Sequence, residues 1–502
     1  MDVRWKNLFA GPTVSNWALP ALLATGALVR IAVWWQNHSL FLDEANLARN
    51  FCERGLFDYF RPLDYDQFAP PLFCMMQKAM TVLFGPNEYA LRVFPLVCSL
   101  LALYFFYRLA RQALTCTWVL APALWIFCFS DILLRYAAEG KPYGCDAAVA
   151  LGLVFWLIKP GRPVFATAVI GVVAVWLSMP SVFVLFGGGM VLSLRAWRAS
   201  GRRAQLELLF PVALWVLSFG LYYTLLLRPS LLVGTLVEYH RQWFFPLPPL
   251  DQADWRKAGA LLLTFPYYTA GFTVLAKLAG SAGILTGLAI VFRRHTETAL
   301  LLAAPMLAGV LASGLGQYSL IPRLLVWAFP LALLLQALGW QLWWQHSHRF
   351  LLPLLMAVFW VTAGLHLGLR HFVEPYVVEE VRPVLQAIGR DFRPGDVLYV
   401  HHEAWPATAY YRDCHAGRDR YQFGRRVIHG NWDERPTLEK VSVSGRQPGR
   451  VWLVYSHVVS GQTRASMQAD LKAIGAFARQ IRAIEQPGAR GYCYVLLSAV
   501  PQ

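Results

Sequence analysis

Hydrophobic residues in this chain gather in long blocks that short polar stretches separate. A bilayer core of about 30 Å requires roughly 20 apolar residues per helix, and most of the blocks are close to this length. We therefore predict about eleven transmembrane helices. Their ranges are 17–35, 88–107, 117–134, 144–158, 163–178, 181–194, 205–227, 273–292, 297–314, 321–340 and 351–369.

The apolar stretch 163–194 decides the count and the orientation. As one helix it would be about 48 Å long, which is too long for one crossing, and Pro180 can end one helix and start another. Dividing it places the basic clusters on one side, as the positive-inside rule expects of cytoplasmic loops. With a cytoplasmic N-terminus, these clusters are Arg108 and Arg111, Lys159 and Arg162, Arg195, Arg198, Arg202 and Arg203, and Arg293 and Arg294.

This orientation puts four segments on the extracytoplasmic side: 36–87, 135–143, 228–272 and the residues from about 372. We predict a transmembrane domain over 1–371, with an outer loop at 36–87, and an extracytoplasmic α/β domain over 372–502. In the latter, 396–411 and 450–459 have the pattern of β-strands, and 463–481 has that of a helix.

Composition supports a membrane protein. Hydrophobic residues make up 57% of the chain and charged residues only 15%, against about 25% charged in soluble domains. The 45 Lys and Arg outnumber the 29 Asp and Glu, and basic cytoplasmic loops beside anionic lipids account for the excess. Because no nucleic-acid-binding motif is present, we exclude nucleic acid as a partner.

Two cysteines, Cys414 and Cys493, lie in the polar C-terminal region. Disulfides persist in extracytoplasmic compartments, so these two residues are candidates for a pair. The sequence leaves open whether they are joined.

Two adjacent carboxylates, Asp43 and Glu44, follow the first predicted helix by about eight residues. One explanation is structural, because acids at a helix start suit the helix dipole and can cap free N–H groups. The other is a functional site. The segment 36–87 is long and rich in aromatic and acidic residues, and such loops usually build a site because ordering them costs entropy.

Pro70 and Pro71 stiffen this loop and precede an amphipathic stretch. We expect a helix lying along the membrane surface there. Phe73, Met76 and Met80 would face the lipid, and Gln77 and Lys78 would face water.

Five stretches occur in order along roughly the first 370 residues: "LDEA" (Leu42–Ala45), "APPLF" (Ala69–Phe73), "NEYALRVFPLVCSLLALYFFYRLAR" (Asn87–Arg111), "RYAAEGKPYGCDAAVAL" (Arg135–Leu151) and "IPRLLVWAFP" (Ile321–Pro330). This ordered set resembles the polytopic C-type glycosyltransferases. These include protein O-mannosyltransferases and the bacterial enzymes that add aminoarabinose to lipid A.

The resemblance implies an α-helical polytopic fold and an inverting glycosyltransferase. A sugar arrives on a polyprenyl phosphate and passes to an acceptor hydroxyl of a glycan, lipid or protein at the outer face of the cytoplasmic membrane. An acceptor hydroxyl needs a carboxylate to take its proton. Asp43 matches the family's catalytic Asp and is the expected general base. Glu44 would orient Asp43 or bind a sugar hydroxyl or a cation, and each acid would raise the pKa of the other.

The leaving phosphate needs cations at the same face. Arg323 follows an outer loop, and the loop 135–143 supplies further candidates, although basic residues at span ends can also simply reach toward the interface. The donor and substrate-binding candidates are Arg135, Tyr136, Glu139, Lys141, Tyr143 and Arg323.

One position departs from the family pattern. The aminoarabinose transferases have a Lys before their Pro-Pro, where it helps to bind the donor phosphate, and this chain has Ala69. Phosphate binding would therefore fall on the other cations. No cofactor is implied, and a requirement for a divalent cation stays open.

Two other classes fit a polytopic protein, namely a secondary transporter or lipid flippase and a non-catalytic envelope scaffold. Transporters usually have internal repeats and ionisable residues near the bilayer midplane. Here no repeat is visible and the candidate charges gather at one face. We therefore favour the enzyme.

Overall fold

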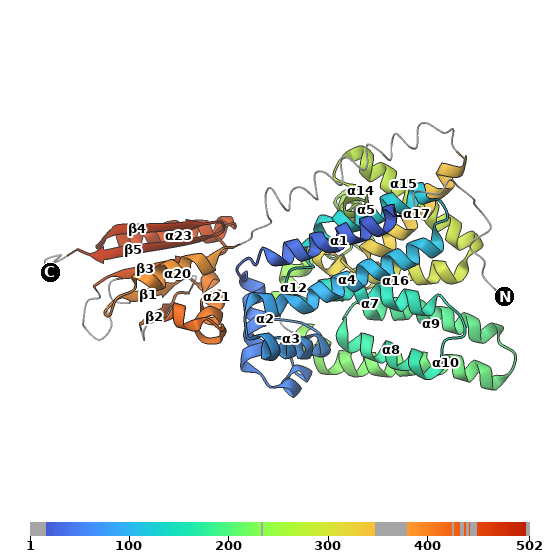
Figure 1. The fold of residues 1–502 in the computed structure, drawn as a ribbon, viewed down its shortest axis with the longest axis horizontal. Coiled ribbons are helices and arrows are strands. Elements are labelled where there is room, and N and C mark those ends of the chain that lie inside the picture. Colours follow the sequence, from blue (N-terminus) through green and yellow to red (C-terminus); the bar gives the residue numbers. More distant parts are fainter. Residues whose placement is uncertain are drawn as a thin grey trace.

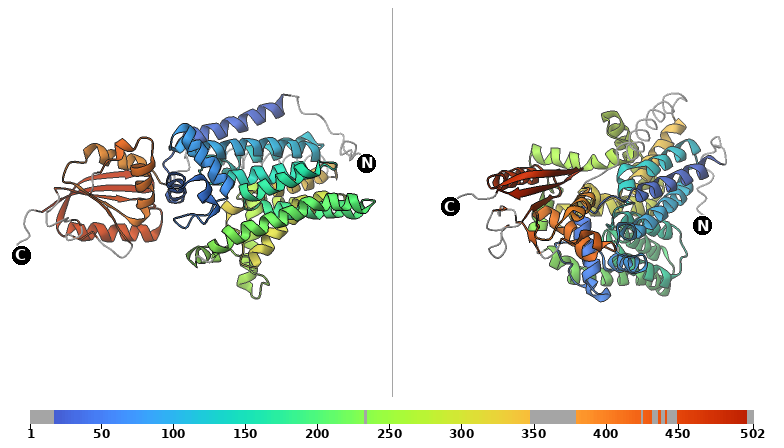
Figure 2. Two further views of the ribbon diagram at one scale, coloured as in Figure 1. Left: turned by 90° about the horizontal axis from the view of Figure 1, so that it is seen from below. Right: turned by 60° about the vertical axis from the view of Figure 1, so that its left-hand side comes forward.

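The computed structural model describes residues 17–231, 234–346, 379–423, 426–431, 436–437, 441 and 449–497. It consists of a bundle of helices and a smaller domain built on a β-sheet (Figure 1). The two parts lie end to end, and α2 and α3 are at the end of the bundle that contacts the sheet domain (Figures 1 and 2).

The bundle helices follow the predicted apolar blocks. Within the described residues, five helices are long and apolar enough to cross a membrane: Ala18–Trp35, Glu88–Ala113, Arg202–Ser230, Val274–Arg294 and Thr296–Gly314. Each predicted span up to residue 340 contains a helix, the span 351–369 lies outside the described residues, and the total of eleven stays a prediction. The helices of the bundle are α1 (Ala18–Trp35), α4 (Glu88–Ala113), α5 (Thr117–Phe129), α6 (Asp131–Arg135), α7 (Tyr143–Leu157), α8 (Val164–Leu177), α9 (Ser181–Arg198), α10 (Arg202–Tyr222), α11 (Arg228–Leu231), α15 (Val274–Arg294), α16 (Thr296–Gly314) and α17 (Phe329–His346).

Two predicted spans differ in detail from the observed helices. The span 117–134 is divided, because α5 ends at Phe129 and α6 begins at Asp131. The span 321–340 begins with a 3₁₀ helix, Pro322–Leu325, before α17 starts at Phe329. Both interruptions lie near the site described below.

Small residues allow α15 and α17 to pack closely. A Cβ atom added to Gly287 would overlap the carbonyl oxygen of Leu335, and one added to Gly339 would overlap the backbone of Gly283. Close approach through small residues is typical of membrane helices, where packing rather than burial from water drives association.

The segments predicted to lie outside the membrane form shorter helices. They are α2 (Leu42–Glu53), a 3₁₀ helix (Leu56–Phe60), α3 (Pro71–Phe84), α12 (Gly234–Arg241), α13 (Gln252–Leu262) and α14 (Thr264–Ala270). The expected orientation of α3 is wrong at Phe73 and at Gln77, since both side chains are fully buried because α3 packs on α4. The ring centroid of Phe73 lies 5.8 Å from that of Phe94, and Gln77 donates to the carbonyl of Leu91 at 2.8 Å.

The sheet domain confirms the predicted small C-terminal α/β region. Its strand order is β2-β1-β3-β5-β4, with β2, β1 and β3 parallel and β5 and β4 antiparallel to their neighbours. The strands are β1 (Val397–Val400), β2 (Val427–His429), β3 (Val451–Tyr455), β4 (Ala478–Gln486) and β5 (Ala489–Leu496), and the helices are α20 (Val381–Asp391), α21 (Trp405–Ala409) and α23 (Gly461–Gly475).

The predicted strand 396–411 is correct only to Val400. A 3₁₀ helix (His402–Ala404), α21 and a π-helix (Tyr410–Cys414) follow it, and a further 3₁₀ helix is Arg418–Tyr421. The predicted helix 463–481 ends at Gly475, since the chain returns as β4 from Ala478.

Candidate active site at the start of helix α2

The two predicted acids lie in the first turn of α2, after Phe41 at its N-cap, and no side chain caps the helix. Their side chains have different partners. Asp43 accepts a hydrogen bond from Arg323 Nη1 at 3.0 Å, whereas Glu44 is paired with Arg92 at 2.8 Å. The structural explanation by capping therefore does not account for them.

Asp43 and Arg323 are partly open to solvent, with side-chain exposures of 28% and 24%. Burial would raise the pKa of Asp43, but the nearby cations Lys141 and Arg323 together outweigh it and lower that pKa. The expectation that adjacent acids raise the pKa of Asp43 is therefore wrong. Asp43 is an ionised carboxylate in an electropositive setting.

Glu44 is buried in a network of hydrogen bonds. It accepts from Arg92 and, at 2.6 Å, from the backbone N–H of Gly140. Arg92 also donates to the carbonyls of His38 and Ser39. Glu44 thus holds the loop 135–143 against α2 and α4.

The loop 135–143 presents the predicted cations and aromatics beside these acids. Arg135 Nε donates to Glu139 at 3.2 Å, and Lys141 donates to Gln67 at 2.6 Å. Burial raises the pKa of Glu139 to about 7. The nearby Arg135 opposes this shift, and the negative charge of Glu44 adds to it. The rings of Tyr136 and Tyr143 pack edge to face at 4.8 Å.

Two cavities flank the Asp43–Arg323 pair. The first, of about 190 Å³, contains Asp43, Lys141, Tyr143 and Arg323 in its wall. The second, of about 260 Å³, has in its wall Arg135, Tyr136, Glu139, Tyr143 and Arg323. Tyr143 and Arg323 border both.

The structure thus brings seven of the eight predicted residues to the walls of these two cavities. Glu44 borders neither of them and faces a smaller cavity of about 50 Å³ with Arg135 and Glu139.

Arg323 has one hydrogen-bond donor that no described residue uses. Its Nε atom is buried and has no hydrogen-bond partner among the described residues. The guanidinium also lies over the ring of Tyr239, 5.6 Å from the ring centroid. A buried donor without a partner is costly in a protein interior, which makes this nitrogen a ready donor for an anion.

Sequence reasoning missed several residues of the first cavity. Gln67, Asp146, His240 and Tyr318 belong to its wall. Gln67 lies within the predicted catalytic loop, but no motif marks it. His240 lies in the aromatic-rich outer loop 228–272, and burial, with Arg323, lowers its pKa to about 4, so that it stays neutral.

The sheet domain contributes a further charge. His457 Nδ1 lies 2.6 Å from Glu379 Oε1, which raises the pKa of His457 against the effect of burial. In its protonated form, His457 adds to the effect of Lys141 and Arg323 in lowering the pKa of Asp43. As for a metal, no cluster of three or more ligating side chains occurs within the described residues.

The geometry has a counterpart among solved structures. Over 97% of this chain and 100% of the other, the fold is similar to ArnT from Cupriavidus metallidurans bound to undecaprenyl phosphate, with 15% sequence identity and a TM-score of 0.54. The apo form of that protein gives 0.53 with the same identity. No protein-family model and no curated protein sequence matches the chain.

The fold is therefore a C-type glycosyltransferase fold, and several of its helices are long and apolar enough to cross a membrane. More particularly, it resembles ArnT, a lipid A aminoarabinose transferase. This confirms the fold class read from the ordered motifs.

Proposed function

We propose that this protein is an inverting glycosyltransferase that moves a sugar from a polyprenyl phosphate to an acceptor hydroxyl. The single observation that carries the proposal is the meeting of Asp43, Lys141 and Arg323 in the wall of one cavity. A carboxylate and two cations are what this reaction requires, one to accept a proton and the others to stabilise a departing phosphate.

In this proposal the donor phosphate binds at Arg323, between the two cavities. The Nε–H of Arg323, which has no hydrogen-bond partner among the described residues, and the rest of its guanidinium suit a phosphate oxygen. The phosphate competes with Asp43 for Arg323, so that donor binding loosens the 3.0 Å ion pair and frees the carboxylate to face the acceptor.

The reaction then takes place in one displacement. The acceptor oxygen attacks the anomeric carbon while Asp43 accepts the hydroxyl proton, and the carbon–oxygen bond to the phosphate breaks. The electron pair leaves with the polyprenyl phosphate, whose charge Arg323 and Lys141 stabilise. Attack opposite the leaving group inverts the anomeric centre.

The site faces the extracytoplasmic side of the cytoplasmic membrane in this account, as the distribution of basic loops favours. The sheet domain lies on the same side, at the α2 end of the bundle (Figure 1). Membrane lipids surround the bundle, and the acceptor hydroxyl belongs to a glycan, a lipid or a protein.

The test is a transfer assay in proteoliposomes. Wild type and Asp43→Asn are supplied with a panel of undecaprenyl-phosphate-linked sugars and with an extract of envelope glycans, lipids and proteins as acceptors. The release of undecaprenyl phosphate is measured. We expect release by the wild type and its loss in Asp43→Asn, which keeps an oxygen for Arg323. Asp413→Asn, at an exposed acid of the sheet domain, should act as the wild type. Equal release by Asp43→Asn would overturn the assignment.

A further inference from the structure

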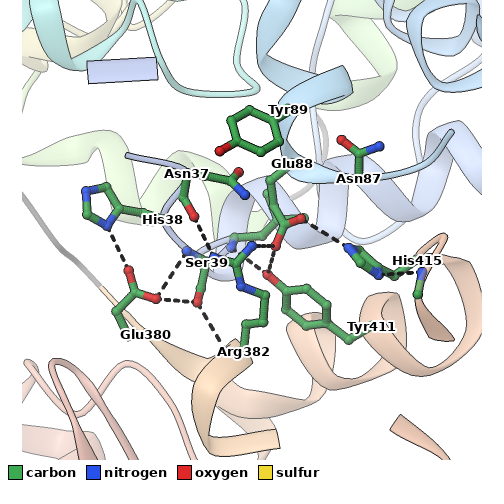
Figure 3. Close-up of polar contacts among 12 residues, drawn as sticks. Asn37, His38, Ser39, Asn87, Glu88, Tyr89, Glu380, Arg382, Tyr411 and His415 are labelled. Carbon is green, nitrogen blue, oxygen red and sulfur yellow. Dashed lines mark hydrogen bonds and ion pairs between the residues drawn. The ribbon is translucent and has the colours of Figure 1, made fainter. Parts of the chain in front are cut away.

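The sheet domain is docked on the bundle through a buried acid. Glu88, at the start of α4, is 1% exposed and lies 2.7 Å from Arg382 Nη1 of α20. It also accepts a hydrogen bond from Tyr411 at 2.8 Å and lies 3.1 Å from His415 Nε2. Figure 3 shows these side chains converging from the two parts of the chain.

Backbone contacts fix the same segment of the sheet domain. The N–H of Ala416 donates to the carbonyl of Pro86 at 2.9 Å, and the N–H of Leu40 donates to the hydroxyl of Tyr411 at 3.0 Å. The π-helix Tyr410–Cys414 therefore packs in a defined position against α2.

This docking places two cysteines face to face. Cys52 lies in the last turn of α2, and Cys414 is the last residue of the π-helix. Both residues are thiols and partly exposed, and the π-helix that ends at Cys414 packs on α2. Each thiol lies close enough to the other to be the largest influence on its pKa. Cys493, the partner considered from the sequence, is instead buried in β5.

The six other cysteines are buried. Cys98 and Cys145 are also neighbours, but they lie in α4 and α7, inside the bundle, where an oxidising protein cannot reach them. They provide an internal control, namely two neighbouring thiols that an oxidising protein cannot reach.

We propose that Cys52 and Cys414 form a disulfide that ties the helix carrying Asp43 to the sheet domain. The inference rests on the extracytoplasmic orientation of the proposed function, because disulfides form and persist there.

The bond forms by thiol–disulfide exchange with an oxidised dithiol protein of that compartment. The Cys52 thiolate attacks its disulfide to give a mixed disulfide, and Cys414 then displaces the carrier as a dithiol. The two cysteines lose two protons and two electrons, which reduce the carrier. The Lys78 ammonium donates to the carbonyl of Cys52 at 3.5 Å. A neighbouring cation favours a thiolate, so Cys52 is the better attacking group.

The experiment uses the full chain from cells quenched with acid. Free thiols are blocked with N-ethylmaleimide under denaturing conditions, and a non-reducing tryptic digest is analysed by mass spectrometry. Cleavage at Arg49, Arg54, Arg412 and Arg418 gives "NFCER" and "DCHAGR". We expect these two peptides linked, with a mass two hydrogens below their sum, and separated after reduction.

Both peptides carrying N-ethylmaleimide, or a link from Cys414 to Cys493, would overturn the inference. In the supporting outcome, Cys98 and Cys145 of the wild type are alkylated. In the Cys52→Ser variant Cys414 is alkylated, and in the Cys493→Ser variant Cys52 and Cys414 remain linked. Sugar transfer is measured on the same preparation. Transfer with free thiols refutes only the disulfide, and a linked pair without transfer refutes only the proposed function.

Discussion

Asp43 and Glu44 are neighbours in one helical turn, and each is paired with an arginine from another helical segment. The Asp43–Arg323 pair is about one quarter exposed and borders two cavities, whereas the Glu44–Arg92 pair is 3% and 5% exposed. Arg323 retains a buried donor without a partner among the described residues, while Arg92 is fully engaged with Glu44 and two carbonyls.

From this difference we infer a catalytic role for the Asp43–Arg323 pair and a structural role for the Glu44–Arg92 pair. A buried ion pair holds its groups in place, because removing either leaves an uncompensated charge. An arginine at a cavity wall can exchange its carboxylate partner for a ligand at little cost in free energy. Adjacent residues of the same chemical type thus have separate tasks, and substitutions at each should affect different measurements.

The largest expected effect is on catalysis. Asp43→Asn removes the proposed base and should reduce sugar transfer about 10²- to 10⁴-fold, the usual contribution of general base catalysis. The thermal midpoint in detergent should change little, because Asn still accepts a hydrogen bond from Arg323. A fall in transfer that merely follows a loss of folded protein would remove the contrast with Glu44.

The second effect is on stability. Glu44→Ala leaves Arg92 buried without its carboxylate and should lower the free energy of unfolding by about 3–5 kcal/mol, measured by denaturant unfolding in detergent. Glu207→Ala, at an exposed i,i+4 pair with Arg203 in α10, should cost less than about 1 kcal/mol. Equal losses in the two variants would contradict a structural role for Glu44.

The third effect is on donor binding. Arg323→Gln removes charge-assisted hydrogen bonds of roughly 1.5–3 kcal/mol and should weaken undecaprenyl phosphate binding about 10- to 100-fold. Microscale thermophoresis of the labelled protein gives the affinity. Arg256→Gln, at an exposed position of α13, is the matched control. Similar affinities for both variants would exclude Arg323 as the phosphate ligand.

The smallest effect is on pH dependence. Lys141 and Arg323 lower the pKa of Asp43, so the wild-type carboxylate stays ionised as the pH falls below neutrality. Arg323→Gln should raise that pKa, protonate Asp43 at a higher pH, and move the acid limb of the kcat profile upward. An unchanged or downward-shifted acid limb would contradict the coupling between Asp43 and Arg323.

The bundle was predictable from the sequence because membrane-length apolar blocks are visible without tertiary information. The interruptions within the predicted spans 117–134 and 321–340 could be predicted less well. No proline marks the break between Phe129 and Asp131, and Arg323 was assigned to the beginning of a span although a 3₁₀ turn precedes α17.

The candidate residues could be predicted because their charges follow apolar blocks and because the family resemblance implies a role for Asp43. Their pairings in the structure could not be predicted, since they join residues far apart in the chain. Arg92 lies in a predicted span, within the stretch Asn87–Arg111 that supports the resemblance, but no role was predicted for it. In the structure it is the buried partner of Glu44. Likewise, Cys414 contacts Cys52 rather than Cys493 only because the sheet domain docks on α2.

The most direct test is a cryo-electron-microscopy structure of the protein with undecaprenyl phosphate. The account predicts phosphate density within hydrogen-bonding distance of Arg323, at the junction of the two cavities, with the Asp43–Arg323 contact lengthened. Phosphate bound away from Arg323, with that ion pair intact, would contradict it.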